Sequence, residues 1–505
     1  MFNDYKLVKR TALLEMGVDI YPYNYPAFSL IADVKEKTAG DFRITGRIWA
    51  IRKMGRSFFM DLKDDTGKIQ VYFRTDIFSE HDKTIFELLD LGDILGIEGT
   101  LFTTKTAELT LEAKAFSILA KSVVDIPVGK EREDKQFYRM TDTESKYRNR
   151  YMTWILDDEE RNRIKTRSRI ITFIRNYFQQ KDFLEVNTPV IENCYGGAEA
   201  RPFKVNIWAF HNKEAYLRIS PELYLKRFIV AGFPKVFTIC ENFRNEGIDH
   251  SHNPEFSMLE WYQTYTDYHF QMQQFEDLIY KTCLHITGSA KIVYNNISID
   301  FTPPWKRISM VDAIKEAFHI DVNLLDEEEL YKVLGKFDIN ICRKDFSWGL
   351  GVAYLFEVVC IKKLVQPVFI TDHPKEISSL AKLKRGDDRF VERFEPYVCG
   401  MEIGNAYSEL TDPVVQYERF IEQKQRRNSL EQKLDYEETP IDRDFIKALA
   451  CGMPPTGGVG LGVDRLIMLL TNAPSIRDVI PFPMLSNNDI NELVKIHKKK
   501  SSLNK

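Results

Sequence analysis

Residues 241–265 read ENFRNEGIDHSHNPEFSMLEWYQTY, a polar loop followed by a run in which the side chains alternate in character. In a β-strand, every second side chain points to the same face of the sheet. One face of this run would carry Phe256, Met258, Glu260 and Tyr262. The opposite face would carry Ser257, Leu259 and Trp261. We interpret the first face as part of a binding site, although the solvated side of an antiparallel sheet would give the same alternation.

The loop before this strand favours the binding-site interpretation. Ten consecutive residues contain a cation, an acid, an imidazole and an amide: Arg244, Glu246, His252 and Asn253. A loop that only connects two strands would not require these four functional groups so close together.

A second run, MEIGNAYSE at residues 401–409, repeats the alternation. As a strand it would place Asn405, Tyr407 and Glu409 on one face. The other face would hold the small residues Gly404, Ala406 and Ser408. We expect this small face to pack closely against a helix.

Residues 457–470, GGVGLGVDRLIMLL, combine closely spaced glycines with Arg465 at the start of an apolar helix. Glycines let a ligand approach the backbone, and a helix N-terminus with an arginine favours anions. The spacing fits neither the Rossmann nor the P-loop pattern. A tight junction between strand and helix explains the glycines equally well.

Changes in pattern along the chain divide it into parts. Short strand-like runs with turn signals fill residues 41–128 and predict an OB-fold β-barrel, with a small sandwich as the alternative. The highly charged residues 129–150 predict a linker. Residues 151–492 predict an α+β domain whose mainly antiparallel sheet is flanked by helices. A helical extension at 1–40 and a basic tail at 493–505 complete the division.

Two helices are predicted from local signals. A short helix at residues 5–17 would end at Gly17. Residues 161–180 have apolar side chains at steps of three and four, which predicts a longer amphipathic helix.

The composition argues against several classes of protein. A net charge of −4 and a pI near 6.2 do not fit a protein that coats nucleic acid non-specifically. The cysteines stand singly, which fits reduced thiols rather than a zinc site or a disulfide framework. No run of about 18 apolar residues occurs, so no membrane span is expected. Because the N-terminus also lacks the features of a targeting peptide, we expect a cytoplasmic protein.

Several stretches resemble one enzyme family. FRNEGIDHSHNPEF at 243–256 resembles motif 2 of class II aminoacyl-tRNA synthetases, and GLGVDRLIML at 460–469 resembles motif 3. KDFLEVNTPVI at 181–191 resembles motif 1, which forms the dimer in this class, but has Asp182 where glycine is usual. With RISPELYLKR, EIGNAYSEL and NAPSIRDVIPFP, the chain resembles lysyl-tRNA synthetase over nearly its whole length.

The resemblance implies a homodimeric enzyme that uses ATP to activate L-lysine and transfers the lysyl group to the 3′ end of tRNA(Lys). Its catalytic residues would be Arg244 and Arg465. ATP would contact Arg244, Glu246, His252, Asn253, Phe256 and Arg465. Mg²⁺ would be held by Glu395 and Glu402. Strand parity turns Glu402 away from Asn405, so we expect a bulge near Gly404.

The same resemblance assigns the amino-acid site and the anticodon site. L-Lysine would be bound by Gly197, Glu222, Glu260, Tyr262, Asn405, Tyr407 and Glu409. In this set, Glu222 and the Gly197 carbonyl would hold the α-ammonium, while Tyr262 and Glu409 would hold the ε-ammonium. In the barrel, the anticodon would be read by Arg52, Phe59, Gln70 and Glu108. Phe59 would stack on a base, whereas its neighbour Phe58 is expected in the core.

Other functions stay open at this point. An aspartyl or asparaginyl synthetase of class II shares the barrel, but its substrate pocket would need cations where this chain has acids. A paralogue that attaches lysine to a protein would lack the barrel. A non-catalytic RNA-binding relative would not need Arg244, Arg465, Glu395 and Glu402.

Overall fold

The computed structural model describes residues 2–485 except for 55–56, 75, 129–130, 133–134, 137–141, 340, 344–345 and 432–440. The chain divides into two compact units, Met1–Asp158 and Glu159–Lys505. The predicted tail at 493–505 and part of the predicted linker lie outside the described residues, and the predicted domain limits stay predictions. Within the described part of the chain, no helix is both long and apolar enough to cross a membrane.

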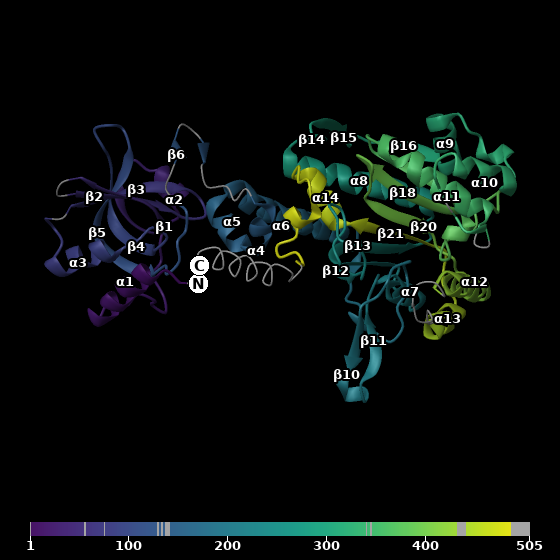
Figure 1. Ribbon diagram of the computed structural model, residues 1–505, viewed down its shortest axis with the longest axis horizontal. Coiled ribbons are helices and arrows are strands. Elements are labelled where there is room, and N and C mark those ends of the chain that lie inside the picture. The colour runs from purple at the N-terminus through teal and green to yellow at the C-terminus, as the bar shows by residue number, and fades with distance from the viewer. Residues whose placement is uncertain are drawn as a thin grey trace, which may run out of the picture. The chain divides into compact units, whose positions relative to one another are not determined.

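The first unit is built around a closed barrel with the strand order β1-β2-β3-β5-β4, which confirms the predicted OB-fold (Figure 1). The strands are Gly40–Met54 (β1), Ser57–Lys63 (β2), Lys68–Arg74 (β3), Ile94–Thr103 (β4) and Leu109–Ala120 (β5). Every second residue of β2 is buried, as the strand period requires. Asp64 holds the turn after β2, because its Oδ1 accepts hydrogen bonds from the backbone N–H groups of Thr66 and Gly67.

Short helices accompany the barrel. They are Asp4–Glu15 (α1), Ile31–Lys35 (α2), Glu80–Leu88 (α3), Thr143–Arg148 (α4) and Arg150–Leu156 (α5). The two-residue strands Glu131–Arg132 (β6) and Lys135–Gln136 (β7) pair with each other. The helix predicted at 5–17 is confirmed as α1, and Gly17 follows it with a φ of +76°, a conformation that favours glycine.

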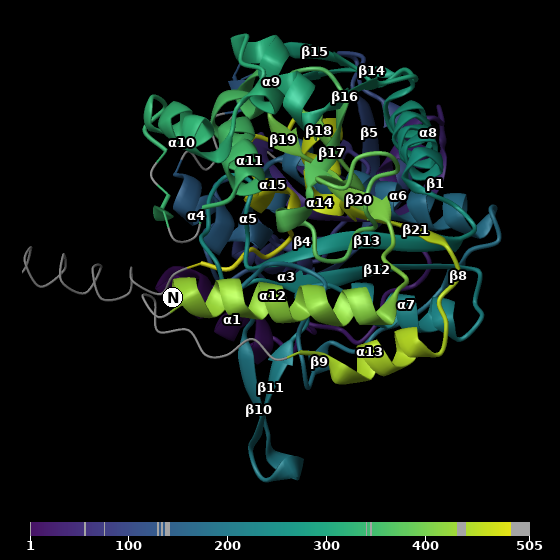
Figure 2. The ribbon, with the colours of Figure 1, turned by 90° about the vertical axis from the view of Figure 1, so that its right-hand side faces the viewer.

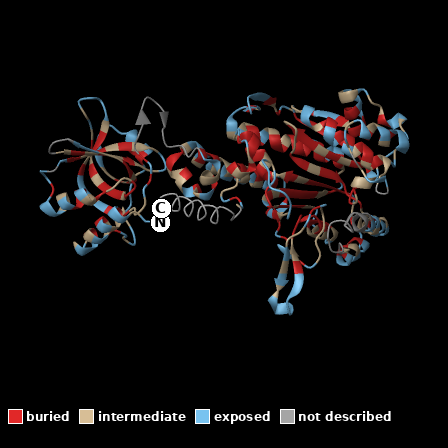
Figure 3. Cartoon of the chain, in the orientation of Figure 1, coloured by how far each residue is buried: buried red, intermediate tan, exposed pale blue. Residues whose placement is uncertain are grey.

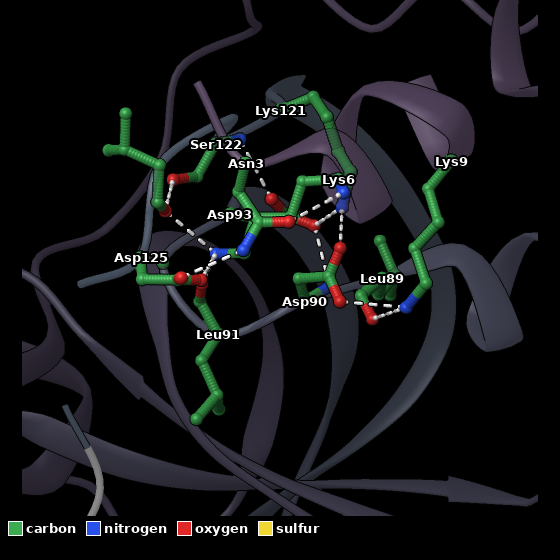
Figure 4. A network of polar contacts seen from close by, with 12 residues as sticks. Asn3, Lys6, Lys9, Leu89, Asp90, Leu91, Asp93, Lys121, Ser122 and Asp125 are labelled. Carbon is green, nitrogen blue, oxygen red and sulfur yellow. Dashed lines mark hydrogen bonds and ion pairs between the residues drawn. The ribbon is translucent and has the colours of Figure 1, made fainter. Parts of the chain in front are cut away.

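Buried lysines attach α1 to the barrel (Figure 4). Lys6 Nζ donates hydrogen bonds to two backbone carbonyls of the barrel, at 3.1 and 2.8 Å. Lys9 Nζ lies 2.7 Å from Asp90 Oδ1. Lys121 Nζ lies 2.6 Å from Asp90 Oδ2 and 2.8 Å from Asp93 Oδ2. These contacts make the N-terminal helix part of the barrel unit.

The second unit contains a large sheet in the order β16-β17-β18-β20-β21-β13-β12-β8, with β19 beside β18. Its pairs are antiparallel except β16 with β17 and β12 with β8, which confirms the predicted mainly antiparallel sheet. The strands are Leu184–Glu185 (β8), Lys235–Phe243 (β12), Glu255–Thr264 (β13), Lys306–Ser309 (β16), Val368–Pro374 (β17), Phe390–Val398 (β18), Met401–Glu402 (β19), Gly404–Ser408 (β20) and Thr456–Gly462 (β21).

Helices cover both faces of this sheet, and Figure 3 shows the strands between them as largely buried. One face packs against Asp158–Gln179 (α6), Tyr268–Thr287 (α8) and Val463–Leu470 (α14). The other face packs against Glu222–Val230 (α7) and Arg443–Ala450 (α13). The helix predicted at 161–180 is confirmed as α6, which begins slightly earlier.

The two alternating runs behave as predicted. In β13, Leu259 and Trp261 are fully buried in the core under α6 and α8, while Tyr262 packs on the α7 side. The small face of β20 lies against α8, because a Cβ at Gly404 would contact the Phe275 ring. Ser408 Oγ also accepts a hydrogen bond of 3.0 Å from the backbone N–H of Tyr268.

The remaining elements surround this sheet. The helices are Met310–Phe318 (α9), Glu327–Gly335 (α10), Trp348–Val359 (α11), Pro413–Glu431 (α12) and Ile476–Val479 (α15), and a hairpin is formed by Lys291–Tyr294 (β14) and Ile297–Asp300 (β15). A second hairpin, Lys204–Ile207 (β10) and Lys213–Leu217 (β11), projects away from the sheet beside Ile191–Glu192 (β9) (Figure 2).

The backbone conformation at Asp182 explains why glycine is usual at this position of the stretch 181–191. Its φ is +61°, in the left-handed region that glycine adopts without strain. Aspartate tolerates this region better than most residues. Aspartate at this position can therefore form the same turn between α6 and β8 as glycine would.

Candidate active site

A cavity of about 620 Å³ lies on the sheet surface formed by β13, β20 and β21. It brings together almost all of the predicted lysine, ATP and metal residues: Gly197, Glu222, Arg244, Glu246, His252, Asn253, Phe256, Glu260, Tyr262, Glu395, Glu402, Asn405, Tyr407 and Arg465. Glu409 lies behind the lining, where a Cβ on the lining residue Gly458 would collide with its Oε1. The four predicted anticodon residues belong to the barrel unit instead.

Arg244 follows β12 and lies over an aromatic ring of β13. Its guanidinium carbon is 5.1 Å from the centre of the Phe256 ring. Burial lowers the pKa of Arg244, while Glu402 and Glu246 raise it. An arginine nevertheless stays protonated in proteins, so the cavity contains a permanent cation at this point.

The polar loop between β12 and β13 is held by its own aspartate. Asp249 Oδ1 accepts hydrogen bonds from the backbone N–H groups of Ser251 and His252. Asp249 Oδ2 lies 2.8 Å from His252 Nδ1, and His252 Nε2 lies 3.1 Å from Arg465 Nη2. If Nδ1 carries the proton, Nε2 accepts from Arg465, and the loop is linked to the start of α14.

A second contact fixes the start of α14 against β13. The buried Asp464 accepts a 2.7 Å hydrogen bond from the backbone N–H of Ser257 and pairs with Arg167 of α6. Arg465 then points back to β19, where its Nη1 donates a hydrogen bond of 2.5 Å to the Glu402 carbonyl. Neither Arg167 nor Asp464 was predicted from the sequence as a site residue, although Asp464 directly precedes the predicted Arg465.

The predicted irregularity near Gly404 is confirmed, and it lies at Ile403. There the strand is interrupted between β19 and β20. Tyr397 pairs with Glu402, whereas Phe394 pairs with Ala406, so the register shifts by one residue. Glu402 and Asn405 consequently both line the cavity.

The two predicted metal carboxylates differ in their surroundings. Glu395 accepts hydrogen bonds from Arg393 Nη2 at 2.6 Å and from the Tyr397 hydroxyl at 2.8 Å. Burial raises the pKa of Glu402, and the nearby charge of Glu395 raises it further, whereas Arg465 and Arg393 lower it. Arg393 was not predicted, yet its guanidinium also donates to Asn405 Oδ1 at 2.9 Å.

The opposite end of the cavity is acidic and closed by phenols. Glu260 Oε1 accepts a 2.9 Å hydrogen bond from Ser220 Oγ. Burial and the nearby Glu222 raise the pKa of Glu260 to about 8. The Tyr407 hydroxyl donates a 2.6 Å hydrogen bond to Glu222 Oε2. Tyr262 is buried beside these acids.

A lysine that the sequence analysis missed lies between two of the acids. Lys226, on α7, is 0% exposed. Its Nζ is 2.6 Å from Glu222 Oε1 and 2.5 Å from Glu409 Oε2. The spacing of Glu222 and Lys226 on a helix indicates their pairing, but the contact with Glu409 has no local signal.

Comparison with known proteins matches both units. The model for class II tRNA synthetases (D, K and N) matches residues 142–486, and the model for an OB-fold nucleic acid binding domain matches 42–119. A lysine–tRNA ligase of Methanospirillum hungatei is 41% identical over 497 residues, which cover 96% of this chain and 95% of that protein. The chain belongs to the lysine–tRNA ligase family. Lysine–tRNA ligase 2 of Methanosarcina mazei is 42% identical over 501 residues, which cover 97% of this chain and 95% of that protein. A lysine–tRNA ligase of Clostridium novyi is 44% identical over 448 residues, which cover 88% and 85%.

Membership of the lysine–tRNA ligase family agrees with the acidic end of the cavity. The matching synthetase model covers the D, K and N enzymes together, so it does not choose among them. The similarity to lysine–tRNA ligases over nearly the full length makes that choice. Three acidic side chains lie at the closed end, Glu222, Glu260 and Glu409, and acids suit a cationic side chain better than aspartate or asparagine.

The barrel of this lysine–tRNA ligase family member presents aromatic rings. Phe59 stacks on Tyr72 with ring centres 4.9 Å apart, and Phe58 is buried in the core as predicted. Arg52 forms an ion pair of 2.6 Å with Asp61. Gln70 Oε1 accepts a 3.0 Å hydrogen bond from Thr110 Oγ1, and Glu108 lies exposed directly before β5. Tyr72 was missed, although its position two residues after Gln70 places it on the same face.

Proposed function

We propose that this chain activates L-lysine with ATP and transfers the lysyl group to the 3′ end of tRNA(Lys). The observation that carries the proposal is a single cavity with arginines at one end and carboxylates at the other. Arg244, Arg465 and His252 suit the phosphates of ATP. Glu222, Glu260 and Glu409 suit the two ammonium groups of lysine.

The chemistry needs no general base in the activation step. A free α-carboxyl group has a reference pKa of about 3.5, so the carboxylate of lysine is already ionised at neutral pH. It attacks the α-phosphorus of ATP, the bond to the β-phosphate breaks, and pyrophosphate leaves with its electrons. Arg244 and Arg465 neutralise the charge that develops on the phosphate oxygens. A hydroxyl of the terminal ribose of the tRNA then attacks the acyl carbon of the adenylate and loses its proton, the bond to the phosphate breaks, and AMP leaves.

Mg²⁺ held by Glu395 and Glu402 is the cofactor that we propose. Among the described residues, no group of three or more His, Cys, Asp or Glu side chains is arranged to hold a metal. Two carboxylates still suit Mg²⁺, which commonly takes the rest of its ligands from phosphates and water. The cation would supply positive charge to the phosphates of ATP. Both carboxylates line the cavity, and because burial and then the charge of Glu395 raise the pKa of Glu402, a cation at this point would favour its ionised form.

Recognition of tRNA(Lys) by the barrel is a further part of the proposal. Phe59 is half-buried and backed by Tyr72, which leaves an aromatic face for a base. Arg52, Gln70 and Glu108 supply donors and acceptors for base edges. Stacking of this kind contributes about 1–3 kcal/mol per base.

We also propose a homodimer through residues 181–191 and a cytoplasmic location. Apolar side chains of this segment are exposed: Leu184 by 47%, Val190 by 43% and Ile191 by 53%. Exposed apolar side chains that gather in one segment are typical of an interface. None of the seven cysteines, all of them within the described residues, forms a disulfide, which fits a reducing compartment.

Charging of transcribed tRNA(Lys) with labelled lysine tests the proposal. We expect ATP-dependent charging with lysine, and none of tRNA(Asp) with aspartate or of tRNA(Asn) with asparagine. Charging of either control tRNA, with none of tRNA(Lys), would overturn it.

A further inference from the structure

Lys226 is a buried cation behind the acidic end of the cavity. Its Nζ lies 2.6 Å from Glu222 Oε1 and 2.5 Å from Glu409 Oε2, and the side chain is 0% exposed. The ring centres of Tyr407 and Phe445 lie 5.5 and 5.9 Å from the same nitrogen. The family assignment of lysine contacts gives this residue no role.

The contacts of Lys226 and Tyr407 leave one oxygen of this ion pair uncontacted. Lys226 donates to Glu222 Oε1 and the Tyr407 hydroxyl donates to Glu222 Oε2. Glu409 Oε2 forms an ion pair with Lys226 but no hydrogen bond with the residues that the structure describes. Glu409 Oε1 has neither contact among those residues.

Gly458 lines the cavity directly in front of this buried oxygen. A Cβ at Gly458 would collide both with Glu409 Oε1 and with the Tyr262 ring. The missing side chain therefore lets the carboxylate and the phenol ring approach the same point on β21. A substrate ammonium that reaches that point would lie beside Glu409 Oε1 and the Tyr262 ring.

We propose that Lys226 is a positioning residue that favours the ionised form of Glu409 and leaves its Oε1 for the ε-ammonium of the substrate. The inference rests on the proposed lysine activation and deepens it. Lys226 itself does not touch the substrate. It acts through the carboxylate that does.

The ion pair with Lys226 acts against the burial of Glu409. The pKa of Glu409 lies well above its usual value because burial raises it, with Glu222 and Glu260 adding to the rise, and the Lys226 ammonium lowers it without cancelling that rise. The remaining groups that face the pair are Tyr262 of β13, Tyr407 of β20 and, acting on Tyr407 from β18, Arg393. Lys226 is thus the only cation among the described residues that pairs directly with Glu409. Without it, Glu409 would hold its proton to a higher pH.

Lys226→Met tests the proposal, because methionine fills a similar volume without charge. We expect kcat/KM for lysine in ATP–pyrophosphate exchange to fall by about tenfold or more at pH 7. Each unit by which the pKa of Glu409 rises above the assay pH lowers its ionised fraction about tenfold. The deficit should shrink as the pH rises from 6.5 to 9, since Glu409 then ionises. The ATP dependence at saturating lysine should change less than twofold.

Lys281→Met is the matched control. Lys281 pairs with Asp277 at the same four-residue spacing on a helix, but it lies at the surface. It should keep the kcat/KM of the wild type at every pH. A loss in Lys226→Met that is equal for lysine and ATP, or that is the same at every pH, would show a structural role and overturn the proposal.

A second test compares Glu409→Gln with the double variant Lys226→Met/Glu409→Gln, and it applies even if Lys226→Met alone does not fold. If Lys226 acts through Glu409, the double variant should lose little more kcat/KM for lysine than Glu409→Gln alone. Independent, multiplying losses would contradict the proposal. Failure of the wild type to exchange pyrophosphate with lysine would instead refute the proposed function.

Discussion

Glu409→Gln removes one charge from the closed end of the cavity and keeps the size of the side chain. Glu409 is 1% exposed, so its charge is not screened by bulk water. Lys226 stays paired with Glu222, and the glutamine oxygen can still accept from Lys226. The substrate ε-ammonium loses its anionic partner.

The expected cost follows from this burial. Leaving a buried charge without its partner costs about 2–5 kcal/mol, which corresponds to a loss of about 30-fold to several thousand-fold in kcat/KM for lysine. The KM for ATP should hardly change, because Arg244, Phe256 and Arg465 are untouched. ATP–pyrophosphate exchange at varied lysine and varied ATP measures both quantities.

Glu214→Gln is the matched control, since Glu214 lies on the hairpin strand β11, outside the cavity, and is partly exposed. It should stay within about 0.5 kcal/mol of the wild type. The reasoning is refuted if Glu409→Gln behaves like this control. It is also refuted if lysine and ATP dependence fall equally.

Three further predictions concern the barrel, the pocket acid and the assembly. Phe59→Ala should weaken tRNA charging by about 1–3 kcal/mol through lost stacking while pyrophosphate exchange stays at the wild-type rate; an equal loss in both assays would contradict the anticodon assignment. Burial raises the pKa of Glu260 from 4.5 to about 8, so the folded protein keeps a proton that the unfolded chain releases. Glu260 should therefore make the free energy of unfolding fall as the pH rises from about 4.5 to about 8, by up to about 1.4 kcal/mol per unit, and Glu260→Gln should remove this share of the slope in denaturant titrations, to which Glu192 also contributes; an unchanged slope would refute it. Sedimentation at micromolar concentration should give a dimer that Leu184→Asp, in the segment 181–191, converts to monomer; a fully active wild-type monomer would argue against the dimer.

Local periodicity was enough to predict the parts of the fold that depend on neighbouring residues. The alternation in 255–264 predicted which side chains of β13 enter the core and which enter the cavity, because the strand period alone decides this. The small face of β20 predicted its helix contact for the same reason. The interruption at Ile403 was predictable only because Glu402 and Asn405, both assigned to one site, would point to opposite faces of an uninterrupted strand.

Contacts between distant segments could not be predicted in this way. Lys226 pairs with Glu222 one helical turn away, which the sequence indicates, and with Glu409, which it does not. Asp464 was overlooked because its partners, Arg167 and the Ser257 backbone, come from other elements. Both buried ion pairs depend on how the sheet brings separate strands and helices together.

ATP–pyrophosphate exchange with each of the twenty amino acids in turn tests the central claim most directly. The carboxylates at the closed end of the cavity predict exchange with lysine far above that with any other amino acid. Aspartate and asparagine should give no more than the background without amino acid. Exchange driven by aspartate or asparagine, or no exchange with lysine in a folded protein that binds ATP, would contradict the account.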